Sequence, residues 1–183
     1  MIRCLHVLFS FVGLIIFLPL LTIIFVLALF CNGSPQFSQQ RFGKYKQPFI
    51  LMNFRTMDKN TVSVASHIID AASITLFGHF LRRTRLDESP QLWNVFKGEM
   101  SLVRPRPGLP NQPELTVGRE KLGIFEVRPG ITGLEQVSGV DMSTPELLAE
   151  TDARMIVEMS LTTYFKYIFL TVLGKGSGDR FKS

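Results

Sequence analysis

Cysteine and histidine are scarce in this sequence of 183 residues. The two cysteines, Cys4 and Cys31, lie at opposite ends of one apolar stretch, and the three histidines do not have the spacing of metal ligands. These absences exclude a disulfide framework and a zinc site built from cysteine and histidine. They are typical of a protein that works in a reducing compartment.

Glycine-rich nucleotide loops are also missing. Neither the P-loop pattern nor the dinucleotide-binding pattern occurs, and the sequence shows no internal repeat and no array of heptads. A nucleotide, if the protein binds one, must therefore be held by other features. The length allows one domain of ordinary size beside a membrane element.

Acidic residues are outnumbered by basic ones. The chain has 15 Asp and Glu against 20 Lys and Arg, which gives a net charge of +5. This balance suits phosphate-bearing ligands, anionic lipid headgroups or nucleic acid, and composition does not choose among them. Nucleic acid is disfavoured, because only the Arg-Arg-Thr-Arg run at 82–85 is locally dense in cations and no recognition motif accompanies it.

Charge is absent from Val7 to Cys31. As a helix this stretch would extend about 37 Å, which is enough to cross the hydrocarbon core of a bilayer. A cleaved signal peptide is disfavoured, because bulky Phe30 stands where cleavage needs a small residue. Residues 1–34 are therefore predicted to form a membrane segment, and residues 35–183 a catalytic domain that faces the cytosol.

Pro19 lies near the middle of the apolar stretch, where it predicts a kink or a break. Both flanks are positive: Arg3 precedes the stretch, and Arg41, Lys44 and Lys46 follow it. Because positive flanks stay on the cytoplasmic side, this pattern favours a re-entrant hairpin that enters and leaves one leaflet. A kinked helix that spans the bilayer is the alternative, since spanning helices tolerate proline.

The polar part of the chain reads as a small α/β domain, mostly helical with short strands. Residues 37–54 mix aromatic and polar side chains with turn formers, which predicts short extended pieces. Helices are predicted around Phe77 and Leu81, after Ser89-Pro90 and after Thr144-Pro145. Four prolines between residues 103 and 113 predict either a rigid, ordered loop or a linker.

A further apolar stripe runs from Leu161 to Leu173 with helical spacing. At 13 residues this piece is too short to span a bilayer. It fits either a helix in the protein core or an interfacial helix with its aromatic residues at the depth of the lipid headgroups. The spacing alone does not decide between the two.

Asp87 and Glu88 form the carboxylate pair most suited to chemistry. Residues 82–106 hold more cations than anions around them, and phosphate is the natural ligand of such a patch. Carboxylates in this positive field would stay ionised at neutral pH, and an ionised carboxylate can act as a nucleophile or bind magnesium. Adjacent acids are also common on solvated surfaces, so the pair alone does not prove catalysis.

Two long phrases of the sequence resemble a known family. They are Leu-Arg-Arg-Thr-Arg-Leu-Asp-Glu-Ser-Pro-Gln-Leu-Trp-Asn-Val-Phe-Lys-Gly-Glu-Met-Ser-Leu-Val-Arg-Pro-Arg-Pro at 81–107 and Val-Arg-Pro-Gly-Ile-Thr-Gly at 127–133. Both are similar to the monotopic phosphoglycosyl transferases, the bacterial sugar transferases of polysaccharide and lipopolysaccharide biosynthesis. Shorter matches at 37–43, 53–57 and around Asp152 extend the likeness over nearly the whole chain.

The resemblance implies an enzyme of the bacterial inner membrane. It would move a sugar 1-phosphate from a UDP-sugar to undecaprenyl phosphate on the cytoplasmic face, release UMP and so begin a surface glycan. The sugar expected is an N-acetylated hexosamine derivative, and the expected cofactor is Mg2+. Membrane lipid is a further implied partner, with a second copy of the chain as a candidate for a homodimer.

The resemblance also implies roles for single residues. Asp87 would be the nucleophile that forms a covalent phosphosugar intermediate, and Glu88 would assist proton transfer or bind the metal together with Asp87. The substrate-binding residues would be Arg82, Pro105, Arg106 and Arg128. The family's re-entrant helix breaks at a Ser-Pro pair, which assigns the break here to Pro19, although Leu18 replaces the serine.

Other departures from the family pattern concern the site. Arg85 replaces a serine, Arg104 replaces the glycine of Val-Gly-Pro-Arg-Pro, and Asn53 replaces a lysine. Arg104 would be strained by roughly 1 kcal/mol or more if its position needed a positive φ. A catalytically weakened relative that binds polyprenol phosphate or a partner enzyme is therefore the alternative function. Ala153-Arg154 also stands after Asp152 where many members have a tyrosine pair, and Ser138 replaces a common asparagine. We expect these departures to concern the sugar.

Overall fold

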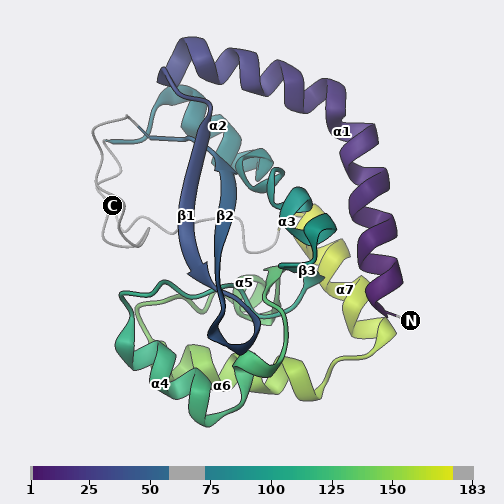
Figure 1. Ribbon diagram of the computed structural model, residues 1–183, viewed down its shortest axis with the longest axis vertical. Helices are drawn as coiled ribbons and strands as arrows, with labels where there is room; N and C mark the ends of the chain where they lie inside the picture. Colours follow the sequence, from purple (N-terminus) through teal and green to yellow (C-terminus); the bar gives the residue numbers. More distant parts are fainter. Residues whose placement is uncertain (1, 58–72, 175–183) are drawn as a thin grey trace. The chain divides into compact units, whose positions relative to one another are not determined.

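The computed structural model describes residues 2–57 and 73–174, which divide into two compact units (Figure 1). Within these residues, unit 1 holds 2–39, 50–57 and 73–97, and unit 2 holds 40–49 and 98–174. The predicted boundary between a membrane segment, residues 1–34, and a catalytic domain, residues 35–183, depends on contact with a membrane and stays a prediction. The predicted fold class, a mostly helical chain with short strands, is confirmed.

Unit 1 begins with the long helix α1 (Ile2–Asn32), which contains Pro19. The helix is bent (Figure 1), as expected for a chain that lacks one backbone hydrogen bond at a proline. The hydroxyl of Thr22 also donates to the carbonyl of Leu18 at 2.8 Å, a contact that often accompanies helix bending. The predicted kink is therefore present, and the chain stays helical through it.

Two strands follow, β1 (Gln36–Phe42) and β2 (Pro48–Phe54), which pair in a two-stranded sheet around the 3-10 turn η1 (Lys44–Lys46) (Figure 1). Burial alternates along β2, as expected for a strand with one face on a core: Phe49 and Leu51 are buried between exposed neighbours. The predicted short extended pieces are thus confirmed.

The helices α2 (Leu76–Thr84) and α3 (Gln91–Lys97) complete unit 1, with the 3-10 turn η4 (Leu86–Glu88) between them. One buried cluster joins α1, β2 and α2 through Ile24, Phe54 and Leu81. A second contact joins α1 to α3, where the rings of Phe11 and Phe96 stack with centroids 5.8 Å apart. The apolar helix α1 is therefore part of the core of this unit.

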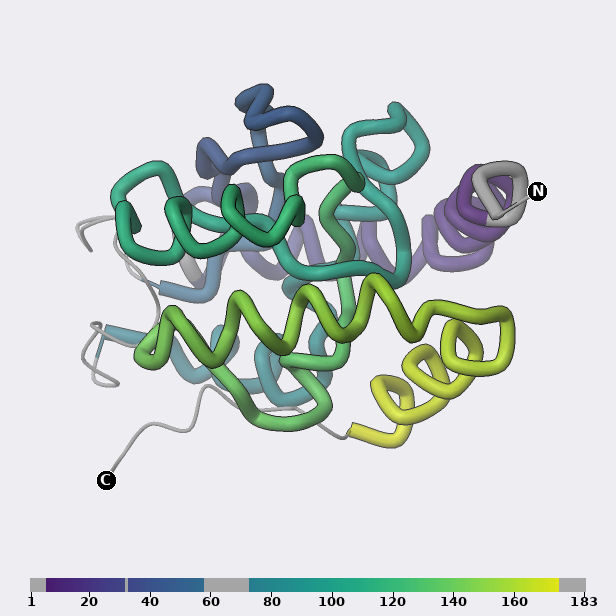
Figure 2. Tube along the Cα trace, turned by 90° about the horizontal axis from the view of Figure 1, so that it is seen from below, coloured from purple at the N-terminus to yellow at the C-terminus, as the bar shows by residue number. Residues whose placement is uncertain are grey.

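Unit 2 contains a parallel strand pair and several helices. Strands β3 (Ser101–Val103) and β4 (Gly130–Thr132) pair with Ser101 opposite Gly130 and Val103 opposite Thr132. The helices and the 3-10 turn are α4 (Pro113–Lys121), η5 (Ile124–Glu126), α5 (Leu134–Ser138), α6 (Pro145–Val157) and α7 (Leu161–Val172). Figure 2 shows α4 and α6 side by side, joined through buried Leu115, Leu148 and Ala149.

Helix α7 has one face in the protein core and another that is apolar and exposed. Tyr164 and Tyr167 are buried and pack with Val103 and Met155. The other face is apolar and exposed, with Leu161, Phe165 and Phe169 at exposed fractions of 48%, 49% and 62%. A core contact is thus confirmed for the tyrosine face, and membrane contact stays a prediction for the exposed stripe.

Candidate active site

The carboxylate pair stands in a tight turn between two helices. Asp87 and Glu88 occupy η4, both are half-buried, and α3 begins three residues later, at Gln91. The position just before a helix is the one predicted. The hydroxyl of Ser89 donates back to the carbonyl of Leu86.

Arg85 makes this turn possible through its backbone. It adopts the left-handed conformation, with φ 58° and ψ 17°, where it ends α2 and begins η4. Its N–H donates to the carbonyl of Arg82 at 3.2 Å. Residues other than glycine rarely adopt such values, which cost of order 1 kcal/mol. This departure from the family pattern is therefore a strained residue directly before the carboxylates.

Arg82 is held by a contact that the sequence did not reveal. Its Nε donates to the hydroxyl of Thr56 at 3.0 Å. Thr56 can reach α2 because Gly78 has no side chain: a Cβ atom there would lie 1.9 Å from the carbonyl oxygen of Thr56. The cap residue Thr75 also donates its N–H to that oxygen at 3.1 Å. The position of the Arg82 guanidinium group is therefore fixed by Thr56.

Helix α3 is fastened to β2 by buried amide side chains. Asn94, which is fully buried, accepts the N–H of Met52 at 3.2 Å and donates to the carbonyl of Ile50 at 2.7 Å. Gln91 donates to the side chain of Asn53 at 2.7 Å, so the residue that replaces the family's lysine has a structural partner. Because α2 and α3 are both fixed, the turn that carries the carboxylates is fixed as well.

In unit 2 the parallel strand pair brings the two family phrases together. The N–H of Arg104 donates to Thr132 at 2.9 Å, and the N–H of Gly130 donates to Pro105 at 2.8 Å. Positive φ values among the described non-glycine residues occur at Tyr45, Lys46 and Arg85, so Arg104 does not need the freedom of a glycine. The backbone of Arg104 is therefore not strained, because strain was expected only if φ were positive and its φ is negative.

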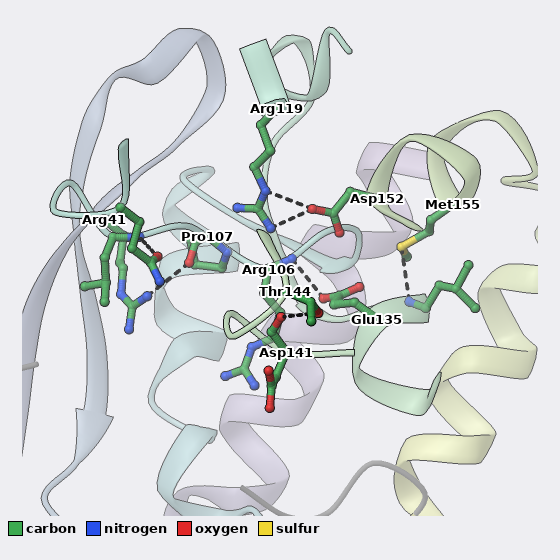
Figure 3. A network of polar contacts seen from close by, with 12 residues as sticks. Arg41, Arg106, Pro107, Arg119, Glu135, Asp141, Thr144, Asp152 and Met155 are labelled. Atoms are coloured by element: carbon green, nitrogen blue, oxygen red, sulfur yellow. Dashed lines mark hydrogen bonds and ion pairs between the residues drawn. The ribbon is translucent and has the colours of Figure 1, made fainter. Parts of the chain in front are cut away.

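The Pro105–Pro107 segment is held on several sides (Figure 3). Besides the bond to Pro105, the carbonyl of Pro107 accepts from Arg41 at 3.2 Å. The backbone N–H of Arg106 donates to the carboxyl group of Glu135 at 3.1 Å. Pro105 and Pro107 are buried and Arg106 is half-buried. The backbone around Arg106 is thus well ordered, as the proline content predicted.

A buried ion pair lies beside this segment. Arg119 binds one carboxylate oxygen of Asp152 through Nε at 2.8 Å and Nη2 at 2.7 Å, with side chains 3% and 0% exposed. Burial raises the pKa of Asp152 to about 6, although Arg119 opposes the rise. Burial, followed by the charges of Arg106 and Arg119, lowers the pKa of Arg41 to about 9.

Arg128 has a structural contact of its own. Its Nε donates to the carbonyl of Gly98 at 2.7 Å, which ties the second phrase to the residue before β3. Of the predicted site residues, the structure therefore groups Asp87, Glu88 and Arg82 in unit 1. It groups Pro105, Arg106 and Arg128 in unit 2, around β3 and β4.

Two hollows open in unit 2. Arg106 and Arg119 border a narrow one together with Phe42 and Phe125. Its volume of about 10 Å³ is far below the usual size of a ligand pocket. A wider, open groove of about 470 Å³ lies among α5, α6 and α7. Ser138 and Arg154 line this groove, whereas Ala153, the other departure expected to concern the sugar, is not among its lining residues.

Sequence reasoning missed Thr56, Asn94 and Glu135. Each acts through a partner at least 26 positions away in the chain, and no local pattern marks such a pairing. Asp152 belonged to the family phrase near the end of the chain, yet its partner Arg119 carried no signal. A buried acid close to a buried arginine emerges only from the fold.

Comparison with known proteins identifies the family of the chain. Residues 1–175 match the family described as bacterial sugar transferase. The chain is 33% identical to a UDP-galactose-lipid carrier transferase of Erwinia amylovora over 85% of the chain and 36% of that protein.

A glucose-1-phosphate transferase of Xanthomonas campestris, which by its name acts on UDP-glucose and undecaprenyl phosphate, is 39% identical over 63% of the chain and 25% of its own length. A putative undecaprenyl-phosphate N-acetylgalactosaminyl 1-phosphate transferase of Bacillus subtilis is 38% identical over 59% and 62%. The chain thus spans about a third or less of the first two relatives. It belongs to the bacterial sugar transferase family.

Proposed function

We propose that this chain transfers a sugar 1-phosphate from a UDP-sugar to undecaprenyl phosphate and releases UMP, as the first step of a bacterial surface glycan. The observation that carries the proposal is the carboxylate turn η4, which both flanking helices hold against the apolar helix α1. This arrangement suits a reaction between a water-soluble donor and a membrane lipid. The names of the relatives support the same substrates.

The proposed chemistry consists of two displacements at one phosphorus atom. A carboxylate oxygen of Asp87 attacks the phosphorus that bears the sugar, and the bond from this phosphorus to the bridging oxygen breaks as UMP leaves. A phosphate oxygen of undecaprenyl phosphate then attacks the same phosphorus. The bond to Asp87 breaks, the carboxylate is restored, and a polyprenyl diphosphate sugar remains in the membrane.

Cations and the second carboxylate have separate roles in this proposal. Arg82, held at Nε by Thr56, binds phosphate oxygens, since a planar guanidinium group suits them. Arg106 binds the phosphate or uridine part of the donor from its ordered loop, with Pro105 and Arg128 supporting the loop. Glu88 handles a proton or helps to bind the metal.

Mg2+ is the proposed cofactor, and the residues present fit it. Among residues 2–57 and 73–174, no group of three or more His, Cys, Asp and Glu side chains could hold a metal ion. Magnesium is often bound by one or two carboxylates, with water and substrate phosphates as its other ligands. Asp87 and Glu88 would hold it, and it would neutralise charge on the donor diphosphate.

The proposed membrane arrangement rests on α1. Residues 6–31 form a helix long and apolar enough to cross a membrane, and 11% of its most apolar window is buried. Both of its halves touch the same unit, Phe11 and Gly13 near α3 and Ile24 near α2. Contact along both halves favours the re-entrant form over a spanning helix, which would carry one half away from the polar domain. With the positive flanks, it supports the cytoplasmic face of the inner membrane.

The sugar proposed is an N-acetylated hexosamine derivative. The Bacillus subtilis relative supports it by name, while the other two relatives are named for galactose and glucose. A donor screen decides among these sugars. The chain in lipid nanodiscs is incubated with undecaprenyl phosphate and one radiolabelled UDP-sugar at a time, and UMP release is measured. We expect release with one donor class, strictly dependent on the lipid acceptor.

Asp87→Asn tests the mechanism. The amide is nearly the same size as the acid but does not act as the nucleophile, so we expect turnover to fall by about a thousandfold or more. The thermal unfolding temperature should stay close to that of the wild type. Glu146→Gln, an exposed change in the first turn of α6, serves as the control. Full turnover by Asp87→Asn would rule out the covalent intermediate.

A catalytically weakened relative is the second candidate, and the strained backbone of Arg85 favours it. Such a chain would bind polyprenol phosphate or a partner enzyme without turnover. UMP release from no donor, followed by release after Arg85→Ser, would support this function. Arg104→Gly should add little, because Arg104 lacks a positive φ.

A further inference from the structure

A buried carboxyl group outside the carboxylate turn holds the loop that carries Arg106 (Figure 3). Glu135 in α5 is 4% exposed, and its Oε1 accepts the backbone N–H of Arg106 at 3.1 Å. The two residues are 29 positions apart, so this bond joins α5 to the loop after β3. The bond fixes the direction in which the chain leaves β3.

The room for this carboxyl group comes from Gly133. A Cβ atom at residue 133 would lie 2.3 Å from Oε2 of Glu135. The φ of Gly133 is −160°, an extended value open to any residue, so space is the reason for this glycine. Oε2 is buried and has no hydrogen-bond partner. An ionised carboxylate in this place would lose its hydration without full compensation.

Three charged residues and one tyrosine interact electrostatically with Glu135. Asp152 on α6 repels a negative charge, while Arg119 on α4 and Arg106 in the loop attract one. Because Arg119 is already bound to Asp152, its charge is shared. Burial first, and then Asp152, raises the pKa of Glu135 to about 7. On α7, burial is the main cause that raises the pKa of Tyr167, and Glu135 adds to it.

We infer that Glu135 is the positioning residue of the donor loop: its protonated carboxyl group holds the backbone of Arg106, and loss of the proton favours opening of the loop. The hold of Glu135 on the backbone of Arg106 does not depend on the proposed function. The consequence for the donor rests on the proposed function, through the role of Arg106. A group that is costly to ionise when buried regains its ordinary acidity when the loop opens, so opening becomes easier as the pH rises.

The test is hydrogen exchange at the Arg106 amide, measured by NMR on the full chain in nanodiscs without substrate. After correction for intrinsic exchange, opening in the wild type should rise by about tenfold or more between about pH 5.5 and about pH 8. Glu135→Gln keeps an acceptor oxygen and cannot titrate, so its amide should stay protected at both pH values. Glu135→Leu should lose protection at both. The exposed control Glu146→Gln should behave as the wild type.

Kinetics supply the second readout. The KM for the UDP-sugar should rise with pH in the wild type and stay flat in Glu135→Gln, with kcat changed little in either. An amide exchange rate that is independent of pH in the wild type, or full protection in Glu135→Leu, would overturn the inference. A chain that releases no UMP refutes the proposed function instead, and the exchange measurement still decides the role of Glu135.

Discussion

Gly78 shows how a missing side chain positions a charged one. The hydrogen atom in place of a side chain lets α2 approach the carbonyl of Thr56, and the hydroxyl of the same threonine binds Arg82. The guanidinium group thus depends on a residue that it does not touch. Functional geometry at this scale is fixed by what fits between backbone segments.

Gly78→Ala should therefore be costly. Its Cβ would overlap the carbonyl of Thr56 at 1.9 Å, so α2 must move away. We expect a loss of roughly 1–3 kcal/mol of unfolding free energy and weaker phosphate binding by Arg82. Denaturant unfolding in detergent measures the first effect. Gly13→Ala is the matched control, since its Cβ would meet its nearest neighbour at an ordinary 3.4 Å, and an equal loss in both variants would contradict the explanation.

Single residues also show the reach of sequence reasoning. Asp87, Glu88 and Arg106 were identifiable because they stand inside long phrases of a family. Glu135 and Thr56 were not, since their partners are distant in the chain. Arg85 and Arg104 both depart from the family pattern, but only a φ value shows which of the two is strained. These φ values depend on the packing of whole segments. The structure assigns the strain to Arg85 alone of the two.

At the scale of elements, periodicity predicted most of the helices and its limits are visible in α7. The apolar stripe of α7 includes both Tyr164 and Phe165, so periodicity alone does not reveal which of them faces the protein. The structure buries Tyr164 and Tyr167 and exposes Phe165 and Phe169. Tyrosine is the residue buried here because Val103 and Met155 offer it a deep contact. The exposed stripe is the part of α7 that we expect to contact a membrane surface.

A probe on this stripe should report lipid contact. With Cys4 and Cys31 replaced by serine, a fluorophore attached through Phe165→Cys should be quenched by lipids with a nitroxide at headgroup depth. The neighbouring Lys166→Cys points off the stripe and should be quenched much less. Equal quenching at both positions would show that α7 does not lie in the interface.

The topology of α1 is a property of the whole chain in its membrane. Because both halves of the helix pack on unit 1, we expect both of its ends on the cytoplasmic side. Single cysteines at Ile2→Cys and Ser34→Cys, in a background without the natural ones, should both resist a membrane-impermeant maleimide in intact spheroplasts and react after lysis. Reaction of only one of them before lysis would establish a spanning helix.

The buried acids give the whole molecule a pH-dependent stability. Folding raises the pKa of Glu135 from 4.5 to about 7 and that of Asp152 from 3.8 to about 6, so the folded state binds more protons over this range. Their contribution to stability is full below the lower values and is lost as the pH rises through about 6 to about 7.

Thermal unfolding between about pH 5 and about pH 8 checks this expectation. The unfolding temperature of the wild type should fall as the pH rises. Glu135→Gln should flatten the fall, because one of the two titrating groups is removed. Identical slopes in both proteins would mean that Glu135 is ionised in the folded state.

The double packing of α1 also sets an order of events during synthesis. The ribosome makes this helix before β2, α2 and α3, the elements that later bury Ile24 and stack on Phe11. The apolar surface of α1 is therefore uncovered until these elements are synthesised. Insertion into the bilayer would keep this surface from aggregating in the meantime. We therefore expect targeting to the membrane to precede folding of unit 1, so that a failure of insertion would also be a failure to fold.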